Sequence, residues 1–564
     1  MNMRSVFLIV PATLLLLPVS APQSVSFPVF SDVTERSAVR FTCNGSPTRE
    51  KYLIETMVGG VALFDYDGDG RMDLFFANGA KLETPQPPGK VPDKSDPRFW
   101  NRLFHNNGDG TFTDVTEQAG VQGHHYSMGV AIGDYDNDGH EDIYVTNFGQ
   151  NILYHNNGDG TFTEVTQKAG VAASGWSASA VFFDFDKDGW LDLLVVRYLE
   201  WDFSLNIYCG LHEEGYRSYC HPNQFKAISH ILYRNNHDGT FSDVSKQSGF
   251  LDSPGYGLGC QINDYNGDGW TDVFVANDAA PQQLYSNHGD GTFSDEGLAA
   301  GAAYNEDGRT FSGMGVDFQD YDNDGWPDIF IGALANERYA LFHNRKGMFE
   351  FATASSGVGP ITMLHSGWGL KIADFDNDGW RDLFVAQSHV MDNINTMSPG
   401  LNYKEPMLMM RNQKGVSFQD ISAQCGEPFK RRQIARGVAF GDLDNDGYID
   451  MAINILNGPA VVLRNEGGTG NHWLLVNTVG TVSNRDGIGA KIRIVGESGR
   501  VQHGFVSTGG SYFSANDKRV HFGLGADKIL NVVEITWPSG IVQRLEKVPT
   551  NQILTVKEPE KPQK

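Results

Sequence analysis

Short apolar segments alternate with polar, glycine-rich turns along most of the chain. The segments "SMGVAIGD" (127–134) and "DIYVTN" (142–147) flank an aspartate-rich turn, and "LYHNNGDGTFTEVT" (153–166) follows them. Apolar runs of roughly four to eight residues bounded by Gly, Asn and Asp are typical of β-strands. Asn and Gly accept the positive φ of tight hairpin turns. This unit therefore predicts two hairpins, or four antiparallel strands.

The unit recurs along the chain. Its aspartate-rich turns begin 50 to 80 residues apart, at Asp65, Asp134, Asp184, Asp264, Asp320, Asp374 and Asp442. A repeat of roughly 50 residues with four strands is typical of a β-propeller blade. Two single strands complete the count, since "FSDVT" (30–34) has no partner before it and "VVLRN" (461–465) has none after it. We predict that these two pair, and that residues 30–466 form an all-β, seven-bladed β-propeller.

Further segments flank the repeats. Residues 1–24 are interpreted as a secretory signal peptide, because Arg4 precedes an apolar run of 12 residues (6–17) that is too short to cross a bilayer. Residues 470–557 contain alternating segments such as "KIRIVG" (491–496) and predict a small β-rich domain. Residues 558–564 predict a disordered tail. We expect the mature protein to be secreted, extracellular or periplasmic, and to lack a transmembrane segment.

Net charge argues against some classes of binding partner, and the cysteines offer either a disulfide or a zinc site. The net charge of −25 argues against nucleic acid or anionic membrane as partners. Of the five cysteines, Cys209 and Cys220 lie close together and could form a disulfide in an oxidising compartment. A zinc site that combines them with His212 and His221 is the alternative, although the spacing fits no zinc-finger pattern.

The aspartate-rich turns predict metal sites. Each reads D-x-[DN]-x-D-G-x-x-D, so that side-chain oxygens at positions 1, 3, 5 and 9 and the carbonyl of position 7 can converge on one cation. The glycine at position 6 permits the sharp turn. An all-oxygen shell suits Ca²⁺ better than a transition metal, and Mg²⁺ demands tighter octahedral geometry. We predict up to seven Ca²⁺ ions. The predicted ligands are Asp65, Asp67, Asp69, Arg71, Asp73, Asp134, Asp136, Asp138, His140, Asp142, Asp184, Asp186, Asp188, Trp190, Asp192, Asp264, Asn266, Asp268, Trp270, Asp272, Asp320, Asp322, Asp324, Trp326, Asp328, Asp374, Asp376, Asp378, Trp380, Asp382, Asp442, Asp444, Asp446, Tyr448 and Asp450.

Two other interpretations of these turns are weaker. Acidic surface turns that bind no ion would not need strict alternation in every copy. Catalytic carboxylate pairs would need unlike environments, whereas these turns are nearly equal. Asn266 replaces one aspartate and is a neutral oxygen ligand, which weakens the fourth site. No catalytic residues are predicted.

The same residues carry a family resemblance. The turns from "DYDGDGRMD" (65–73) to "DLDNDGYID" (442–450) resemble the FG-GAP/VCBS repeats of the integrin α-chain propeller. That resemblance implies calcium-binding loops and a seven-bladed propeller. The segments "NHWLLV" (471–476), "SNRDGIGAKIRI" (483–494), "HFGLG" (521–525) and "WPSG" (537–540) are similar to the ASPIC/UnbV domain. Both parts in this order resemble the cartilage acidic protein family and its bacterial relatives, which implies extracellular, calcium-dependent structure and interaction.

Three long insertions fall between the second and third strands of a unit, at 79–102, 198–230 and 387–406. These connections leave a sheet on the face opposite the aspartate-rich turns, so we expect them to gather there. Their aromatic and histidine side chains either form a binding rim or pack the loops against one another. They are Phe99, Trp100, Trp201, Phe203, Tyr208, Tyr216, Tyr219, His221, His389 and Tyr403.

Two classes of function follow. The first is a secreted calcium-binding scaffold for adhesion to an extracellular protein or carbohydrate. The second is an enzyme, a lyase, hydrolase or cyclase, with its site on the insertion face, because fold does not settle function. No nucleophile elbow, HExxH, P-loop or dinucleotide fingerprint is evident in the sequence. Converging His, Tyr, Arg and carboxylate groups in a pocket would favour the enzyme.

Overall fold

Strands form nearly all regular structure in the computed structural model, which describes residues 27–87 and 89–560. The predicted all-β class is confirmed. The predicted signal peptide at 1–24 lies outside the described residues. In the part of the chain that the structure describes, no helix is long and apolar enough to cross a membrane.

Seven four-stranded antiparallel sheets lie within the described residues 30–465 and are numbered here along the chain. Sheet 1 contains β2 (Val61–Phe64), β3 (Asp73–Phe76), β4 (Arg102–Asn106) and β5 (Phe112–Asp114). Sheet 2 contains β6 (Tyr126–Gly133), β7 (Asp142–Phe148), β8 (Ile152–Asn156) and β9 (Phe162–Glu164). Sheet 3 contains β10 (Ser177–Phe183), β11 (Asp192–Arg197), β16 (Ile231–Asn235) and β17 (Phe241–Asp243). Sheet 4 contains β18 (Gly257–Asn263), β19 (Asp272–Asn277), β20 (Gln283–Asn287) and β21 (Phe293–Asp295).

The remaining three sheets follow the same order of strands. Sheet 5 contains β22 (Val316–Gln319), β23 (Asp328–Ile331), β24 (Ala340–Asn344) and β25 (Phe349–Phe351). Sheet 6 contains β26 (Gly367–Ala373), β27 (Asp382–Gln387), β28 (Leu408–Asn412) and β29 (Phe418–Asp420). Sheet 7 contains β30 (Ala435–Gly441), β31 (Asp450–Ile455), β32 (Val461–Asn465) and, from the start of the chain, β1 (Phe30–Asp32).

The two ends of this region meet in sheet 7. β1 pairs antiparallel with β32, and Phe30 lies opposite Asn465, so the predicted pairing of the two single strands is confirmed. The first strands of successive sheets contact one another in the order β2, β6, β10, β18, β22, β26 and β30, and β30 contacts β2. The sheets therefore surround a common axis, and the pairing of β1 gives sheet 7 its fourth strand.

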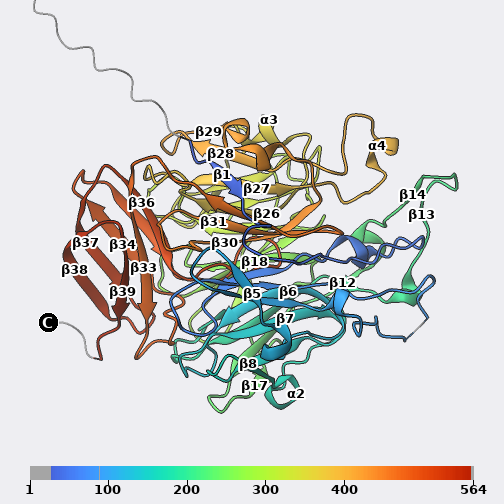
Figure 1. Cartoon of the computed structure of the whole chain (residues 1–564), viewed down its shortest axis with the longest axis horizontal. Coiled ribbons are helices and arrows are strands. Elements are labelled where there is room, and N and C mark those ends of the chain that lie inside the picture. Colours follow the sequence, from blue (N-terminus) through green and yellow to red (C-terminus); the bar gives the residue numbers. More distant parts are fainter. Residues whose placement is uncertain (1–26, 88, 561–564) are drawn as a thin grey trace, which may run out of the picture.

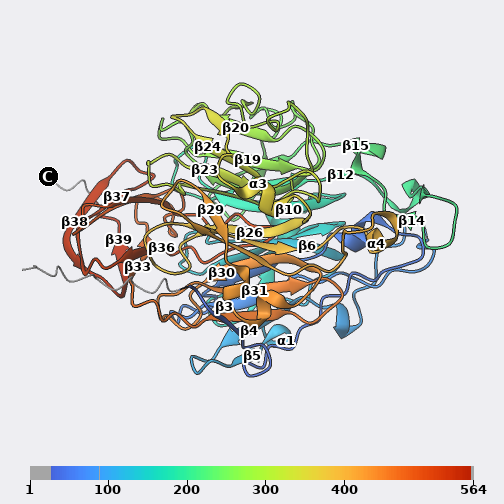
Figure 2. The same ribbon diagram turned by 90° about the horizontal axis from the view of Figure 1, so that it is seen from above.

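Residues 472–557 form two further sheets at one end of the molecule (Figures 1 and 2). The first has three strands, β36 (Val520–Gly525), β33 (His472–Val479) and β39 (Gln552–Lys557). The second has four, β35 (Val501–Phe505), β34 (Lys491–Gly496), β37 (Ile529–Thr536) and β38 (Val542–Pro549). Glu558 follows β39 and was expected in a disordered tail, yet it is buried and accepts hydrogen bonds from the backbone N–H groups of Thr481, Val482 and Ser483. Residues 561–564 lie outside the described residues.

The long insertions extend at the opposite end (Figure 1). They contain the ribbons β12 (Leu199–Glu200) with β15 (Lys226–Ala227) and β13 (Cys209–Gly210) with β14 (Arg217–Ser218), and the short helix α4 (Ile394–Met397). The other short helices are α1 (Thr116–Ala119), α2 (Thr166–Ala169) and α3 (Val358–Thr362). The predicted Cys209–Cys220 disulfide is present, which removes both thiolates from any zinc site.

The connection from β35 to β36, residues 506–519, enters the axis of the seven sheets, and we call it the central plug. Its backbone hydrogen-bonds to strands of five sheets and Ser511 Oγ accepts from Leu370 N of a sixth, while Gly509 lies against Val181 of β10. The backbone pairs are Gly510–Cys260, Ser511–Val316, Phe513–Val130, Ala515–Leu63 and Asp517–Phe440. A connection within the segment that the sequence predicts as a separate domain thus supplies the centre of the sheet assembly.

Aromatic side chains of the central plug pack against side chains of the surrounding sheets. The Tyr512 and Phe513 rings stack with centroids 3.9 Å apart, and the Trp368 ring meets Tyr512 edge-on at 5.0 Å. The Arg436 guanidinium lies 3.8 Å from the Trp368 ring centroid on the other side. All four side chains are buried, so this cluster joins sheets 6 and 7 to the plug.

Replacing Phe513 with alanine tests the role of the plug. We expect Phe513→Ala to lower the free energy of unfolding by about 3–5 kcal/mol, as buried aromatic truncations do, and the protein to unfold in a single transition. Val542→Ala on exposed β38 is the matched control and should change little. Denaturant titration followed by circular dichroism measures both. A loss below about 1 kcal/mol, the usual range for surface sites, would contradict a structural role for the plug.

Candidate metal centre

Each aspartate-rich turn connects the first and second strands of its sheet. The position 6 glycines all have positive φ, between 84° at Gly70 and 96° at Gly139, a region that favours glycine. Their N–H groups donate to the position 1 aspartate in all seven turns, for example Gly139 N to Asp134 Oδ2 at 2.7 Å. The backbone of the turn thus fixes the position of its first carboxylate.

The position 9 aspartate has a second role besides that of a predicted ligand. Asp142 is fully buried, and its Oδ1 accepts a hydrogen bond from Asn156 N at 2.8 Å while its Oδ2 accepts one from Tyr135 N at 3.2 Å. An Asn N–H donates to the position 9 carboxylate in every sheet, at 2.7–2.9 Å. This carboxylate therefore ties the turn to the third strand.

The side chain of the same asparagine connects neighbouring sheets. Asn235 Nδ2 donates to Leu191 O of its own turn at 2.9 Å and to Tyr135 O of the preceding sheet at 2.8 Å. The link to the preceding sheet occurs in all seven sheets, including Asn106 to Leu443 O between sheets 1 and 7. We call these residues the bridging asparagines. They are Asn106, Asn156, Asn235, Asn287, Asn344, Asn412 and Asn465, all buried.

The sequence analysis missed this role, although the signal was present. An asparagine stands at the same place in every third strand, in "HNN" (105–107), "RNN" (234–236), "SNH" (286–288), "HNR" (343–345) and their counterparts. The sequence pattern was interpreted only in terms of strands and turns, and these asparagines were given no role of their own. The aspartates of the hairpin turns, by contrast, have a local role, since Asp159 Oδ1 accepts hydrogen bonds from the N and Oγ1 atoms of Thr161 within the turn.

The residue before each bridging asparagine faces the aspartates, and its chemistry differs among the sheets. It is arginine in sheets 3, 6 and 7, where Arg411 contacts Asp376 and Asp378 at 2.8 Å each. Arg234 and Arg464 bridge the position 3 and 5 carboxylates in the same way. It is histidine in sheets 1, 2 and 5 and Ser286 in sheet 4.

The position 7 side chains of sheets 3 and 4 pack against the following hairpin turn, whereas Arg71 of sheet 1 forms an ion pair with Asp69 of its own turn. The Trp190 ring stacks on His237 of the neighbouring hairpin turn, with centroids 4.9 Å apart, and Trp270 lies against Gly289. The carbonyl of position 7 remains the predicted ligand. In sheet 4, Lys491 of β34 forms an ion pair with Asp264 beside Asn266.

Residues of the C-terminal strands cover several of these turns. Asp486 Oδ2 accepts from Asp134 N at 2.8 Å, and Arg519 donates to Asp442 O at 3.0 Å. Arg485 N donates to Asn137 Oδ1, so Arg485 and Asp486 contact the turn of sheet 2. The aspartate-rich turns and the C-terminal sheets therefore share one interface.

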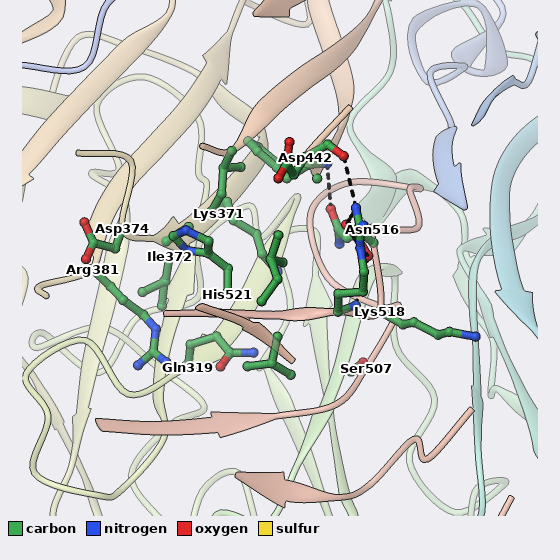
Figure 3. Close-up of a pocket in the computed structure, with 18 of the residues that line it drawn as sticks. Gln319, Lys371, Ile372, Asp374, Arg381, Asp442, Ser507, Asn516, Lys518 and His521 are labelled. Carbon is green, nitrogen blue, oxygen red and sulfur yellow. Dashed lines mark hydrogen bonds and ion pairs between the residues drawn. The ribbon is translucent and has the colours of Figure 1, made fainter. Parts of the chain in front are cut away.

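A polar cavity lies in that interface (Figure 3). Its volume is about 80 Å³, and Lys371, Asp374, Arg381, Lys518 and His521 contribute to its lining. Ligand pockets in proteins usually measure about 300–1,000 Å³. This cavity is consequently too small for a sugar or peptide, and it belongs to the packing of the two parts.

The aromatic residues of the insertions mostly pack inward. Trp201 is buried, and its ring meets Phe203 at 5.2 Å and Trp176 at 5.8 Å. Tyr219 is buried and donates to Glu55 Oε2 at 3.1 Å. Exposed apolar side chains instead gather beside the disulfide. They are Leu205, Ile207, Tyr208 and Leu211, of which Leu211 is 58% exposed, and we call them the apolar tip.

Family comparisons agree with the repeats and the C-terminal motifs. The FG-GAP-like repeat matches residues 65–145, 134–195, 264–331 and 320–385, and the ASPIC and UnbV family matches residues 480–563. The chain is thus an all-β, propeller-like repeat protein of FG-GAP-like units with a C-terminal ASPIC and UnbV domain. This confirms the resemblance stated from the sequence.

Among known proteins, the chain is similar to cartilage acidic protein 1. It is 27% identical to the Homo sapiens protein over 302 residues and 27% identical to the Xenopus tropicalis protein over 308 residues. These matches cover 53% of this chain, and 43% and 44% of the two relatives. The chain therefore matches less than half the length of these relatives.

Solved structures with a similar course of the chain include two lectins. A lectin of Agrocybe aegerita, whose structure concerns non-reducing terminal N-acetylglucosamine, has a TM-score of 0.37 at 18% identity, with 64% of this chain and 79% of that chain covered. The BP39L lectin of Burkholderia pseudomallei has a TM-score of 0.42 at 10% identity, with 73% and 97% covered. No ligand is transferred from either lectin to this chain.

Asn235→Ala tests the bridging asparagines. Both carbonyls that Asn235 satisfies would be left buried without a donor, and each such group costs about 1–3 kcal/mol. We expect the free energy of unfolding to fall by about 2–4 kcal/mol on that basis. Asn236→Ala, one residue later in the exposed turn, is the control and should stay within about 1 kcal/mol. Equal losses in the two variants, measured by urea denaturation, would refute the bridging role.

The buried carboxyls also predict the pH dependence of metal-free protein. Burial raises the pKa of Asp73 and of Asp272 from 3.8 to about 8, and that of Asp142 to about 7. A carboxyl with a raised pKa stabilises the fold while protonated and loses that contribution as pH rises toward the folded-state pKa. Dialysed, chelator-treated protein should therefore melt at a lower temperature at pH 8 than at pH 5. A melting temperature that is flat or rises over this window would contradict the prediction.

Proposed function

We propose that this chain is a secreted, calcium-stabilised, seven-bladed propeller that serves as a scaffold for binding an extracellular protein or carbohydrate. The observation that carries the proposal is the division of the molecule into two ends. The acidic turns contact the C-terminal part. The C-terminal sheets lie at one end of the molecule, and the insertions extend at the other (Figure 1). A rigid assembly with loops at one face is a common arrangement for binding.

Calcium suits the donors of the acidic turns. The turns offer aspartate oxygens and one backbone carbonyl, which are the ligands that Ca²⁺ prefers. Within the described residues, the Oδ1 atoms of Asp136, Asp186 and Asp320 are buried and have no hydrogen-bond partner. A bound Ca²⁺ would satisfy such oxygens and offset the burial that raises the carboxyl pKa values. The predicted ligand residues fit this ion.

The apolar tip is the proposed contact surface. Leu205, Ile207, Tyr208 and Leu211 surround the Cys209–Cys220 disulfide, which fixes the loop that carries them. A disulfide is also typical of proteins outside the cytosol, which agrees with the signal peptide expected at 1–24. An exposed apolar patch with a polar rim often marks a site of protein interaction. We therefore place the partner at the insertion end, with 30–466 as the propeller and 470–557 as the domain that supplies the plug.

One experiment tests both halves of this proposal. Purified protein is compared in Ca²⁺ and in EGTA, first by its melting temperature and then on glycan and peptide arrays. We expect Ca²⁺ to raise the melting temperature by many degrees, because ligands that bind only the folded state stabilise it. Array binding should depend on Ca²⁺ and should drop about tenfold in Ile207→Ser/Leu211→Ser protein, a loss of about 1.4 kcal/mol.

The control for the contact surface is Val542→Ser, an exposed valine of similar size on the C-terminal sheet. It should leave array binding unchanged. An equal loss of binding in the control would contradict the apolar tip as the contact surface. An unchanged melting temperature in EGTA would contradict stabilisation by calcium.

A further inference from the structure

Histidine replaces arginine beside the acidic turns of three sheets. His155 Nδ1 lies 3.2 Å from an oxygen of Asp136 and 3.4 Å from one of Asp142. His343 Nδ1 lies 3.4 Å from Asp322 and 3.2 Å from Asp328, and His105 repeats the arrangement with Asp67 and Asp73. The same three-residue contact therefore occurs in sheets 1, 2 and 5, and the predicted all-oxygen shell omitted it.

The three imidazole nitrogens have only ionic contacts with the protein. Nδ1 of His105, His155 and His343 is buried and makes no hydrogen bond of good geometry among the described residues, although each lies 3.2–3.4 Å from two carboxylates. In the turn of sheet 5 the Oδ1 atom of Asp320 is also buried without a partner, on a residue that is 4% exposed. Buried polar atoms of this kind normally have partners, so an unpaired nitrogen beside unpaired oxygens indicates a missing ligand.

The separations match those of donors on a common ion. Two donors about 2.1 Å from a metal at a tetrahedral angle lie about 3.4 Å apart. The observed nitrogen–oxygen distances are 3.2 and 3.4 Å in all three turns. Imidazole favours transition ions, whereas carboxylates and carbonyls favour Ca²⁺, Mg²⁺ and Mn²⁺. A turn with nitrogen and oxygen donors therefore favours transition ions more than the turns that offer oxygen donors alone.

We propose that the turns of sheets 1, 2 and 5 are mixed nitrogen–oxygen sites for a divalent transition ion, in which His105, His155 and His343 supply the nitrogen. The arginines of sheets 3, 6 and 7 exclude such an ion from their turns, because each guanidinium stands where the imidazole stands, contacts both the position 3 and the position 5 carboxylates, and offers no lone pair. Oxygen donors alone remain there. Arg71 of sheet 1 contacts only the position 5 carboxylate and leaves the position 3 and position 9 carboxylates to His105. This inference rests on the proposed metal binding by the acidic turns and assigns a second metal class to three of them.

The test uses the full chain, freed of metal and saturated with Ca²⁺. Zn²⁺ titration by calorimetry is expected to show three sites in the unaltered protein, and pulsed electron paramagnetic resonance of Mn²⁺-loaded protein is expected to show coupling to imidazole ¹⁴N. Both signals should be lost in the triple variant His105→Gln/His155→Gln/His343→Gln. The control is His288→Gln, a turn histidine two residues after Ser286, which should keep both.

A second variant keeps the test decisive where the triple variant does not fold. Arg464→His changes sheet 7, whose turn retains all four aspartates, and is expected to add one Zn²⁺ site. Absence of ¹⁴N coupling in the unaltered protein, or an unchanged number of Zn²⁺ sites in the Arg464→His protein, overturns the inference.

The calcium response separates the two proposals. If Ca²⁺ raises the melting temperature and no ¹⁴N coupling appears, only the proposal of transition-metal sites fails. If Ca²⁺ has no effect, the calcium proposal fails whatever the Zn²⁺ result.

Discussion

A buried carboxylate at the end of each acidic turn is the interaction on which the sheet assembly depends. Asp142 and its six counterparts accept the backbone N–H of a bridging asparagine, and the side chain of that asparagine reaches the preceding sheet. One pair of residues thus fixes the shape of a turn, its attachment to the third strand and the spacing between two sheets. Because the pair is repeated around the axis and joins sheet 1 to sheet 7, loss of one link is felt by two sheets.

This arrangement explains why the acidic turns and the C-terminal strands occupy the same end. Buried carboxylates are costly unless a cation or hydrogen-bond donors compensate them. The C-terminal part supplies some of that compensation through Lys491, which pairs with Asp264, and through Lys518, which pairs with Glu141. The central plug then carries the same chain segment into the axis. Docking of this domain and neutralisation of the turns are therefore one energetic event, and the sheets and the domain are expected to share their stability.

The sequence predicted local structure well and long-range structure less completely. The spacing of apolar segments and the residues of the turns predicted the four-strand unit and the positive-φ glycines, because both depend on residues close together in sequence. The pairing of β1 with β32 followed from a simple count of strands. The plug was missed because "STGGSYFSAND" (507–517) has no periodicity and reads as a polar loop. Its role depends on contacts with strands that are distant along the chain, from Phe440 of sheet 7 to Leu63 of sheet 1. The bridging asparagines were missed for a different reason: each stands at the end of a strand, next to a polar turn, where an asparagine already has a local explanation.

The residue before each bridging asparagine shows how near-identical turns come to differ. Backbone hydrogen bonds fix the first and last aspartates in the same way throughout, so the turn itself leaves little freedom. The third-strand position is the nearest side chain that can change without disturbing those bonds. Arginine there places a permanent positive charge between two carboxylates, as Arg411 does, and reduces the demand for an ion. Histidine instead places beside the carboxylates a nitrogen that can act as a metal ligand, which arginine cannot do. Variation at this one position can thus tune which cations the ring holds while the fold stays constant.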